Sequence, residues 1–281
     1  NWLVPEDNYM RFGTGKFIAQ NVELVNIREK IIIQSDPAPD SPILIGFREL
    51  NLEYLSSMIA QERPLSGLLQ GDIRLYPKEE GLTFTSDLTI DDFLLQQVLW
   101  GDVALNVEQT VASRFDVDFQ LTGDRNNVTA TGFYSGGQTP SMDIPAVIDR
   151  FDLASLKPIL EDQLTDLQGV ISGRIVAKGT PDVPDIDGQI SVNNTKFIST
   201  YLRTAFAIDG ETISFIDEGI SFDKFEIADQ DGNKASIDGT ILTRTYRDFN
   251  FELDLLTDNF RLFNTTAEDN DLFYGTVDLE A

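Results

Sequence analysis

The chain has 281 residues, of which 47 are acidic and 21 are basic, so its formal net charge is −26 at pH 7. A surface with this charge repels the phosphates of nucleic acids and the headgroups of anionic lipids, which disfavours DNA or RNA binding. Because the sequence contains neither cysteine nor histidine, it excludes disulfides, thiol chemistry, serine–histidine catalysis and histidine-containing zinc sites.

The N-terminal part, residues 1–46, contains short strand-like runs and a Pro-rich connector at residues 36–42. The following segment, residues 51–62, carries Leu52, Leu55 and Ile59 at helical spacing and predicts a short amphipathic helix. Residues 151–164 repeat this spacing, and Pro158 is expected to confine the second helix to the part after Lys157. We interpret both helices as lids on one end of a sheet.

The remaining segments alternate between apolar and polar residues. In Asp248–Leu256, large apolar side chains occupy every second position and acidic or amide side chains lie between them. Successive side chains of a strand point to opposite faces, so one face of this segment is apolar and the other is acidic. Strands of about 5–8 residues that recur every 10–14 residues predict an antiparallel meander, and the lack of long crossover helices argues against a doubly wound parallel sheet.

A weak internal repeat relates two parts of the chain. The segment Leu65–Ile73 aligns with Leu167–Ile175 at an offset of 169 − 67 = 102 residues, and a predicted helix precedes each copy. We therefore divide the chain into N-terminal strands and connector at 1–46, a first helix-plus-strands repeat at 47–150, and a second repeat at 151–281 that continues into the C-terminal strands. A unit used twice predicts an extended array of strands.

Several short motifs are compatible with chemistry, but each has a simpler interpretation. Ser221 and Lys224 match Ser-x-x-Lys, which requires a helix start, whereas their apolar neighbours predict a strand. Gly13–Lys16 lacks the full phosphate-loop pattern and is interpreted as a turn. Asp229–Asn233 lacks the glycine and glutamate spacing of a calcium loop, so we interpret it as a hairpin turn, with a weak cation site as the alternative, and we interpret Asp269–Asp271 in the same way. Acidic pairs such as Asp91-Asp92 are interpreted as part of a solvated face. We expect no enzymatic activity, no cofactor and no metal.

A set of motifs along nearly the whole chain resembles the TamB family, the inner-membrane component of the translocation and assembly module, in a Bacteroidota-like form. The wider relatives of this family are AsmA-like proteins and bridge-like lipid-transfer proteins. The motifs are Trp2–Pro5, Asn8–Gly13, Leu65-Ser-Gly67 with Gly71, Leu167-Gln-Gly169 with Gly173, Lys178-Gly179, Pro184–Gly188, Phe225–Asn233, Asp238-Gly239, Tyr246–Phe251, Asp258–Thr266 and Asp269–Gly275.

The resemblance implies an elongated antiparallel sheet that is curled into an open hydrophobic trough, often called a β-taco. It also implies bridge-like transport of phospholipids between the inner and outer membranes, through the periplasm, with a role in outer-membrane biogenesis. Implied partners are phospholipids, a TamA-like or BAM-like outer-membrane barrel protein, and the inner membrane through an N-terminal anchor. This sequence lacks the family's N-terminal membrane helix and its C-terminal end, so we expect it to be a fragment of a longer chain.

The apolar residues at alternate positions of the strands have two interpretations. The residues pack against a second layer as a closed core, or they line an open trough that holds acyl chains. Dozens of Leu and Phe side chains cannot all face water, because burying each one gains about 1.5–3 kcal/mol. Two short helices cannot cover them, and with the family resemblance we favour the open trough.

The residues predicted to line the trough occupy alternate positions within each strand. It comprises Leu82, Phe84, Leu88, Ile90, Val103, Leu105, Val107, Phe115, Val117, Phe119, Leu121, Ile171, Ile175, Ile190, Val192, Phe206, Ile208, Ile213, Phe215, Phe225, Ile227, Ile237, Ile241, Phe249, Phe251, Leu253 and Leu255.

Two alternative functions remain. One is a scaffold or chaperone that offers its sheet edge to outer-membrane strands by β-augmentation, together with the barrel partner. The other is an extracellular β-sandwich that binds glycans. Glycan binding requires aromatic platforms, whereas Trp2 and Trp100, the two tryptophans of the chain, lie far apart in sequence.

Overall fold

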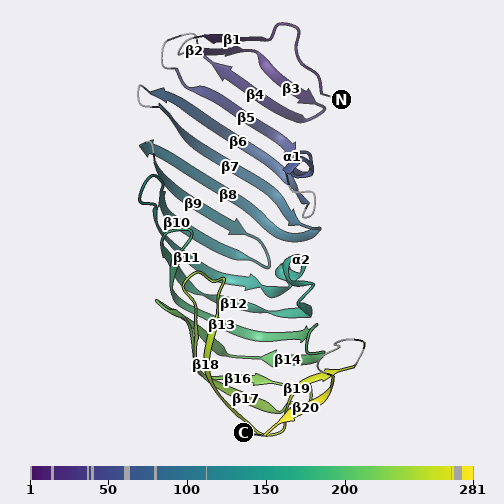
Figure 1. The fold of residues 1–281 in the computed structure, drawn as a ribbon. Coiled ribbons are helices and arrows are strands. Elements are labelled where there is room, and N and C mark those ends of the chain that lie inside the picture. The colour runs from purple at the N-terminus through teal and green to yellow at the C-terminus, as the bar shows by residue number, and fades with distance from the viewer. Residues whose placement is uncertain are drawn as a thin grey trace. The chain divides into compact units, whose positions relative to one another are not determined.

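The fold was analysed in a computed structural model, which describes residues 2–13, 16–36, 38, 41–59, 64–78, 81–111, 113–266, 268 and 274–280. These residues form an all-β fold whose main sheet is antiparallel and has 16 strands, accompanied by two short α-helices (Figure 1). The predicted fold class is therefore confirmed. Neither of these helices is long and apolar enough to cross a membrane.

The strands of the main sheet follow chain order almost throughout. Their hydrogen-bonded order is β18-β17-β16-β14-β13-β12-β11-β10-β9-β8-β7-β6-β5-β4-β3, and β15 pairs with both β13 and β16. Two hairpins, β1–β2 and β19–β20, form separate two-stranded sheets. Contacts divide the chain into unit 1, residues 1–124 with 129–144, and unit 2, residues 125–128 with 145–281.

Unit 1 contains strands β1 to β9, helix α1 and most of β10. The bounds are β1 Tyr9–Gly13, β2 Lys16–Gln20, β3 Val22–Asn26, β4 Glu29–Ser35, β5 Ile43–Asn51, α1 Leu52–Ile59, β6 Leu65–Lys78, β7 Gly81–Leu95, β8 Val98–Val111, β9 Arg114–Thr122 and β10 Asn127–Ser135. Helix α1 begins after Asn51, whose side-chain oxygen accepts a hydrogen bond from the backbone N–H of Glu53 at 2.9 Å.

Unit 2 contains most of β11 and all later elements. The bounds are β11 Ser141–Asp152, the 3₁₀ turn η1 Leu153–Leu156, α2 Lys157–Leu160, β12 Leu164–Gly179, β13 Pro184–Ser199, β14 Thr204–Ile208, β15 Glu211–Ile216, β16 Gly219–Ala228, β17 Lys234–Leu242, β18 Asn250–Thr257, β19 Phe260–Thr265 and β20 Gly275–Leu279. Asp152 caps η1 by accepting a hydrogen bond from the N–H of Ala154 at 2.9 Å.

Two local predictions differ from the structure. The second helix ends at Leu160, and Leu164 instead opens β12, because it pairs with Ser199 across the ladder. Pro158 lies in the first turn of α2, where its missing N–H leaves no hydrogen bond unmade. Asp-Gly pairs are typical of turns and bulges, so the sequence predicts one at Asp238-Gly239. This pair instead lies inside β17, and the bulge is on the opposing strand β16. Asp209-Gly210 lies at a bend between β14 and β15, and Asp231-Gly232 lies in the turn between β16 and β17.

The sequence repeat has a counterpart in the backbone of each unit. At the offset of 102 residues, β5, α1, β6 and β7 correspond to β11, η1–α2, β12 and β13. Gly67 and Gly169 both adopt a positive φ, and a Cβ at Gly67 would lie 2.7 Å from the Ile90 side chain. This close approach explains why glycine is needed there. The division of the chain at residues 46 and 150 remains a prediction.

Candidate functional site

In unit 1, apolar side chains of neighbouring strands lie opposite one another in register. One row contains Leu24, Ile31, Phe47, Gly71, Leu88, Leu105 and Phe119, and a second contains Val22, Ile33, Ile45, Ile73, Ser86, Val107 and Val117. Directly opposed residues of an antiparallel pair share a face of the sheet. One face of unit 1 is therefore apolar from β3 to β9, and we call it the apolar face.

The opposite, outer face of unit 1 is polar and mostly acidic. The row that alternates with the apolar residues contains Asp72, Asp87, Asn106 and Asp118. Arg48 and Arg74 bind the Asp72 carboxylate at 2.9 Å and 3.2 Å. The many acidic side chains thus gather on the solvated side of the strands, away from the apolar face.

The strands of unit 2 form an apolar face in the same way. Its longest row contains Ile175, Gly188, Phe215, Ile220, Ile241 and Phe251, and a shorter row contains Gly173, Ile190 and Ile213. The outer-face partners include Arg174 with Gln189 and Asp238 with Asp254. Each unit therefore presents one apolar and one polar surface.

β-Bulges keep the apolar residues on one face where their sequence parity changes. At four places, consecutive residues of the apolar face are three positions apart in sequence, where an unbroken strand has two. These steps run from Phe47 to Leu50, from Ile90 to Phe93, from Val192 to Thr195 and from Phe222 to Phe225, and the ladder register shifts beside each. A bulge inserts one residue and so restores the face that a three-residue step would otherwise reverse. A non-glycine residue with positive φ lies in each step: Glu49, Asp92, Asn194 and Lys224.

Aspartate side chains from adjoining segments hold three of these bulges. The backbone N–H of Asp92 donates to Asp102, that of Asn194 to Asp209 and that of Lys224 to Asp238, at 2.9, 2.8 and 3.1 Å. These carboxylates satisfy donors that the ladder leaves unpaired at a bulge. Sequence reasoning missed this role, although a change in apolar parity next to an Asp-rich strand is a signal that points to it.

Most of the predicted lining residues are half buried. Leu121, Val192, Phe206 and Phe225 are buried, whereas Leu82, Phe249, Phe251, Leu253 and Leu255 are exposed. The accessible surface is 17253 Å², and a compact monomer of this length exposes about 12,000 Å². The excess agrees with the half-buried state of most of the predicted lining among the described residues.

The apolar face of unit 1 is closed at one end of its strands. Leu50, Leu52 and Leu69 form a buried cluster there, against which Trp2, Ile31, Phe47, Leu88, Ile90 and Phe93 pack. Figure 1 shows α1 at this end of β5 and β6, and its Tyr54 contacts Trp2 edge to face. The helix therefore covers the end of the apolar face.

The apolar face of unit 2 is covered in part by the β19–β20 hairpin. Phe260 of β19 stacks on Phe206 of β14 with ring centroids 5.9 Å apart, and Ala235 completes the buried cluster. Phe197, Leu202 and Ile227 pack around it. This contact explains why Phe206 is only 6% exposed while most of the predicted lining is half buried.

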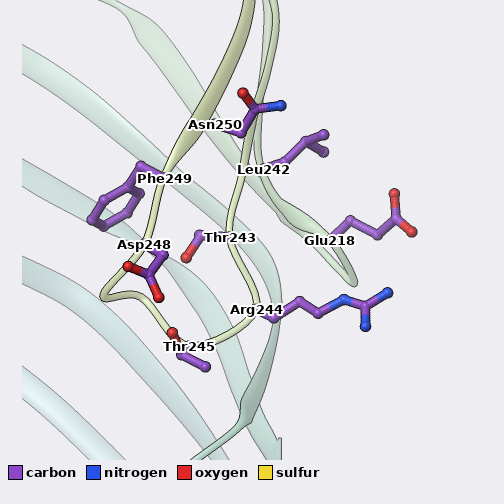
Figure 2. Close-up of a pocket in the computed structure, with 8 residues that line it drawn as sticks. All are labelled: Glu218, Leu242, Thr243, Arg244, Thr245, Asp248, Phe249 and Asn250. Carbon is purple, nitrogen blue, oxygen red and sulfur yellow. The ribbon is translucent and has the colours of Figure 1, made fainter.

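A cavity of about 430 Å³ lies where β17 connects to β18. Figure 2 shows that its charged groups do not converge, because Arg244 and Glu218 point to one side and Asp248 and Phe249 to the other. Such an arrangement lacks the focused polar groups of a catalytic pocket.

The short motifs that are compatible with chemistry lie in ordinary strands, bulges and turns where the structure describes them. Ser221 and Lys224 lie in β16, and Lys224 occupies its bulge. The Asp229 carboxylate accepts hydrogen bonds from Asp231, Asn233 and Arg261. Over the described residues, His, Cys, Asp and Glu form no group of three or more that could hold a metal ion. Thr14, Gly15 and Asp269–Asp271 lie outside the described residues.

Strand β18 is an edge of the main sheet. Its side chains are exposed over nearly the whole strand, with Phe251 at 64% and Leu256 at 70%. An exposed apolar edge strand presents unpaired backbone groups to any strand of suitable pattern.

Comparisons of the chain with protein-family models, with curated proteins and with solved structures find no match.

Proposed function

We propose that this protein is a non-enzymatic conduit for phospholipids, whose acyl chains lie along the apolar faces of the two units. In line with the family resemblance, the proposed setting is the periplasm, where the full-length protein carries lipids between the inner and outer membranes. The observation that supports the proposal best is the set of cross-strand rows of mainly apolar residues, most of which are half buried. Acyl chains would remove these side chains from water without a second protein layer.

The polar outer faces support the same proposal. With a net charge of −26, the chain lacks the basic surface that docks on an anionic bilayer. An aqueous span between two membranes is therefore a better setting for these strands than a membrane surface. Passive movement along the face requires no nucleotide or metal.

Lipid carried by the protein is the direct test. Protein purified after gentle extraction should contain phospholipid that mass spectrometry detects at a reproducible ratio to protein. Folded protein that consistently lacks lipid, and that takes up none from vesicles, would contradict the proposal.

A charge on the apolar face should block lipid uptake more than it unfolds the protein. Phe119→Glu places a carboxylate in the first apolar row of unit 1, whereas Gln120→Glu places one on the outer face of the same strand. Because Phe119 is half buried, we expect Phe119→Glu to cost about 1–2 kcal/mol of unfolding free energy, which a domain of ordinary stability tolerates. Uptake of a fluorescent phospholipid should fall about tenfold in Phe119→Glu only, and complete unfolding of this variant would instead indicate a closed core.

The exposed edge strand β18 favours a second candidate function. In this alternative the protein is a scaffold for outer-membrane proteins and pairs with incoming strands, together with a TamA-like or BAM-like barrel. A photo-crosslinking residue at Asn250, on the edge, should then capture a partner strand, while one at Thr240 in the inner strand β17 should not. Equal capture at both positions would argue against edge pairing.

A further inference from the structure

Strand β18 carries different chemistry on its two faces. Its apolar positions continue the apolar face of unit 2, as the pairing of Phe251 with Ile241 shows. Glu252 and Asp254 lie on the outer face, and Asp254 is directly opposite Asp238 of β17. Opposed like charges on a ladder are unfavourable. Because β18 is exposed from Asn250 to Leu256 and is an edge of the sheet, both faces and the backbone are open to a further strand.

Elsewhere on the outer faces, opposed acidic pairs have basic partners. Asp116 lies opposite Glu108 and binds Arg114 at 2.8 Å, and Asp72 lies opposite Asp87 and binds two arginines. Over the described residues, the two acidic side chains of β18 have no ion-pair partner. The negative charge of this edge is therefore uncompensated.

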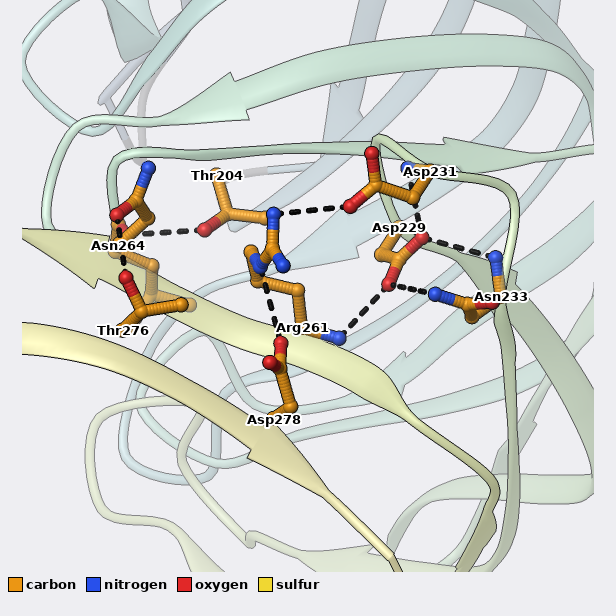
Figure 3. A network of polar contacts seen from close by, with 9 residues as sticks. Thr204, Asp229, Asp231, Asn233, Arg261, Asn264, Thr276 and Asp278 are labelled. Carbon is orange, nitrogen blue, oxygen red and sulfur yellow. Dashed lines mark hydrogen bonds and ion pairs between the residues drawn. The ribbon is translucent and has the colours of Figure 1, made fainter.

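The acidic β16–β17 turn of unit 2 is compensated by Arg261 of β19 (Figure 3). The carboxylate of Asp229 accepts hydrogen bonds from the backbone N–H of Arg261 at 2.8 Å and from the side chain of Asn233 at 3.1 Å. The guanidinium of Arg261 pairs with Asp231 of the turn at 2.9 Å and with Asp278 of β20 at 3.0 Å. We call these contacts the hairpin network. They engage Arg261, so this arginine does not neutralise β18.

The other edge strand of the main sheet, β3, differs from β18. Leu3 pairs with Val25 of β3 through two backbone hydrogen bonds of 2.8 and 2.9 Å. The carboxylate of Glu23, on the same strand, binds Lys30 at 2.9 Å. Part of the β3 edge is thus already paired and its acidic side chain is neutralised, whereas β18 lacks both forms of protection.

A second copy of the chain fits the β18 edge poorly. Two β18 strands that pair antiparallel with their apolar faces together overlap most fully when the pair is centred on Leu253 or on Asp254. The first register places Glu252 opposite Asp254 of the other copy, and the second places Asp254 opposite itself. Both registers oppose carboxylates without a cation, which works against self-association.

We propose that β18 is a docking edge for an extended segment of another protein in which apolar residues alternate with Lys or Arg. Its apolar side chains would cover Phe251 and the other apolar residues of β18, and its basic side chains would lie opposite Glu252 and Asp254. Backbone hydrogen bonds supply affinity in such a pairing, and the charges select the partner and its register. This inference rests on the edge-pairing function proposed above and names the class of strand that it takes.

Peptide binding tests the preference for a basic strand. The probes are fluorescent peptides of eight residues, the length of β18. A basic peptide alternates Val with Lys, an acidic peptide alternates Val with Glu, and a scrambled peptide has the composition of the basic one without its alternation. Fluorescence anisotropy at about 0.15 M salt, where the Debye length of about 8 Å limits long-range attraction, should show about tenfold tighter binding of the basic peptide than of the other two.

Charge reversal at the edge provides the matched variant. Glu252→Lys with Asp254→Lys should weaken binding of the basic peptide about tenfold and strengthen binding of the acidic peptide to a similar degree. Asp187→Lys with Asp223→Lys is the control, because it changes the net charge equally at exposed residues of the inner strands β13 and β16. A photoactivatable group in the basic peptide should label β18, as mass spectrometry would show.

The possible failures of this test are distinguishable. Equal binding of the basic and acidic peptides, with labelling at β18, would overturn the preference for basic strands and leave edge pairing intact. Labelling elsewhere, or none, would overturn the docking edge together with the edge-pairing function. Sedimentation of the parent protein as a dimer that crosslinks through β18 would show that a second copy takes the edge. Lipid uptake is measured without these peptides, so the conduit function stands or falls separately.

Discussion

At the scale of single residues, the aspartates of the outer face differ in their contribution to the stability of the fold. Asp238 accepts the N–H of Lys224 at the β16 bulge, whereas Asp254, directly opposite on β18, faces Asp238 with a like charge. A hydrogen bond of this kind contributes about 1 kcal/mol, and opposed like charges on a ladder are unfavourable. The same side chain at two neighbouring positions therefore has opposite effects on stability.

Alanine at these two positions should separate the effects. We expect Asp238→Ala to lower the free energy of unfolding by about 1 kcal/mol, and Asp254→Ala to leave it unchanged or raise it slightly. Urea unfolding of both variants and the parent protein measures the difference. Equal destabilisation by both substitutions would show that the bulge hydrogen bond is not the cause.

The pH dependence of the hairpin network follows from Asp229. Burial raises the pKa of Asp229, but the hydrogen bonds from the backbone of Arg261, the side chain of Asn233 and the backbone of Asn233 and Asp231 outweigh it, so the pKa lies below the ordinary 3.8. A lowered pKa in the folded state means that the carboxylate stabilises the fold above pH 3.8, and that this contribution is lost as pH falls through the lowered pKa.

Asp229→Asn should therefore be destabilising at neutral pH and lose its effect in acid. We expect the difference in unfolding free energy between the parent and Asp229→Asn to be constant from pH 7 to about pH 5 and to shrink below the ordinary pKa of 3.8. Denaturant titrations at a series of pH values measure it, with the exposed Asp223→Asn as the control. A difference that grows in acid would contradict the assignment.

At the scale of elements, each bulge keeps a whole strand segment on the correct face. Asn194 is the extra residue in β13, after which Thr195, Phe197 and Ser199 point to the apolar face. Without it, Phe197 would point to the outer face and leave Phe206. Deletion of Asn194 should thus act through the register of β13, because the Asn194 side chain itself is exposed.

Deletion of Asn194 should lower the free energy of unfolding by several kcal/mol, or prevent folding, because it reverses a buried segment. Deletion of Gly137, in the β10–β11 turn where a Cβ would meet no other atom, should cost much less. Thermal and urea unfolding compare the two variants. Similar stability of both would show that the sheet corrects the register elsewhere.

The sequence predicted the strands and helices better than it predicted how they pair. Alternation such as Phe249, Phe251, Leu253 and Leu255 fixes the strand and its two faces, and the spacing around Leu52 fixes the helix. The bulge at Asn194 depends on a contact with Asp209, fifteen residues away, which no local pattern contains. The stacking of Phe260 on Phe206 likewise requires tertiary contact, so the hairpin cover over the predicted lining escaped sequence reasoning.

At the scale of the whole molecule, the proposed lipid transport has a consequence for charge: if the protein takes up lipid, its net charge should control which membranes deliver it. The net charge of −26 repels anionic vesicles over a Debye length of about 30 Å at 10 mM salt, which shrinks to about 8 Å at 150 mM. We expect phospholipid uptake from anionic vesicles to accelerate severalfold between these concentrations, and uptake from zwitterionic vesicles to stay constant. Stopped-flow fluorescence measures both rates. Faster uptake from anionic vesicles at low salt would contradict the expectation.

The correspondence of β5–α1–β6–β7 with β11–η1–α2–β12–β13 has an evolutionary consequence. Since most strands of the main sheet pair only with their two neighbours, a gene can gain or lose such a module with little change to the others. Every inserted strand would widen the sheet by about 4.8 Å. Tandem duplication therefore offers a simple way for descendants of one ancestral module to change the width of the sheet, which the proposed conduit would need in order to span gaps of different size.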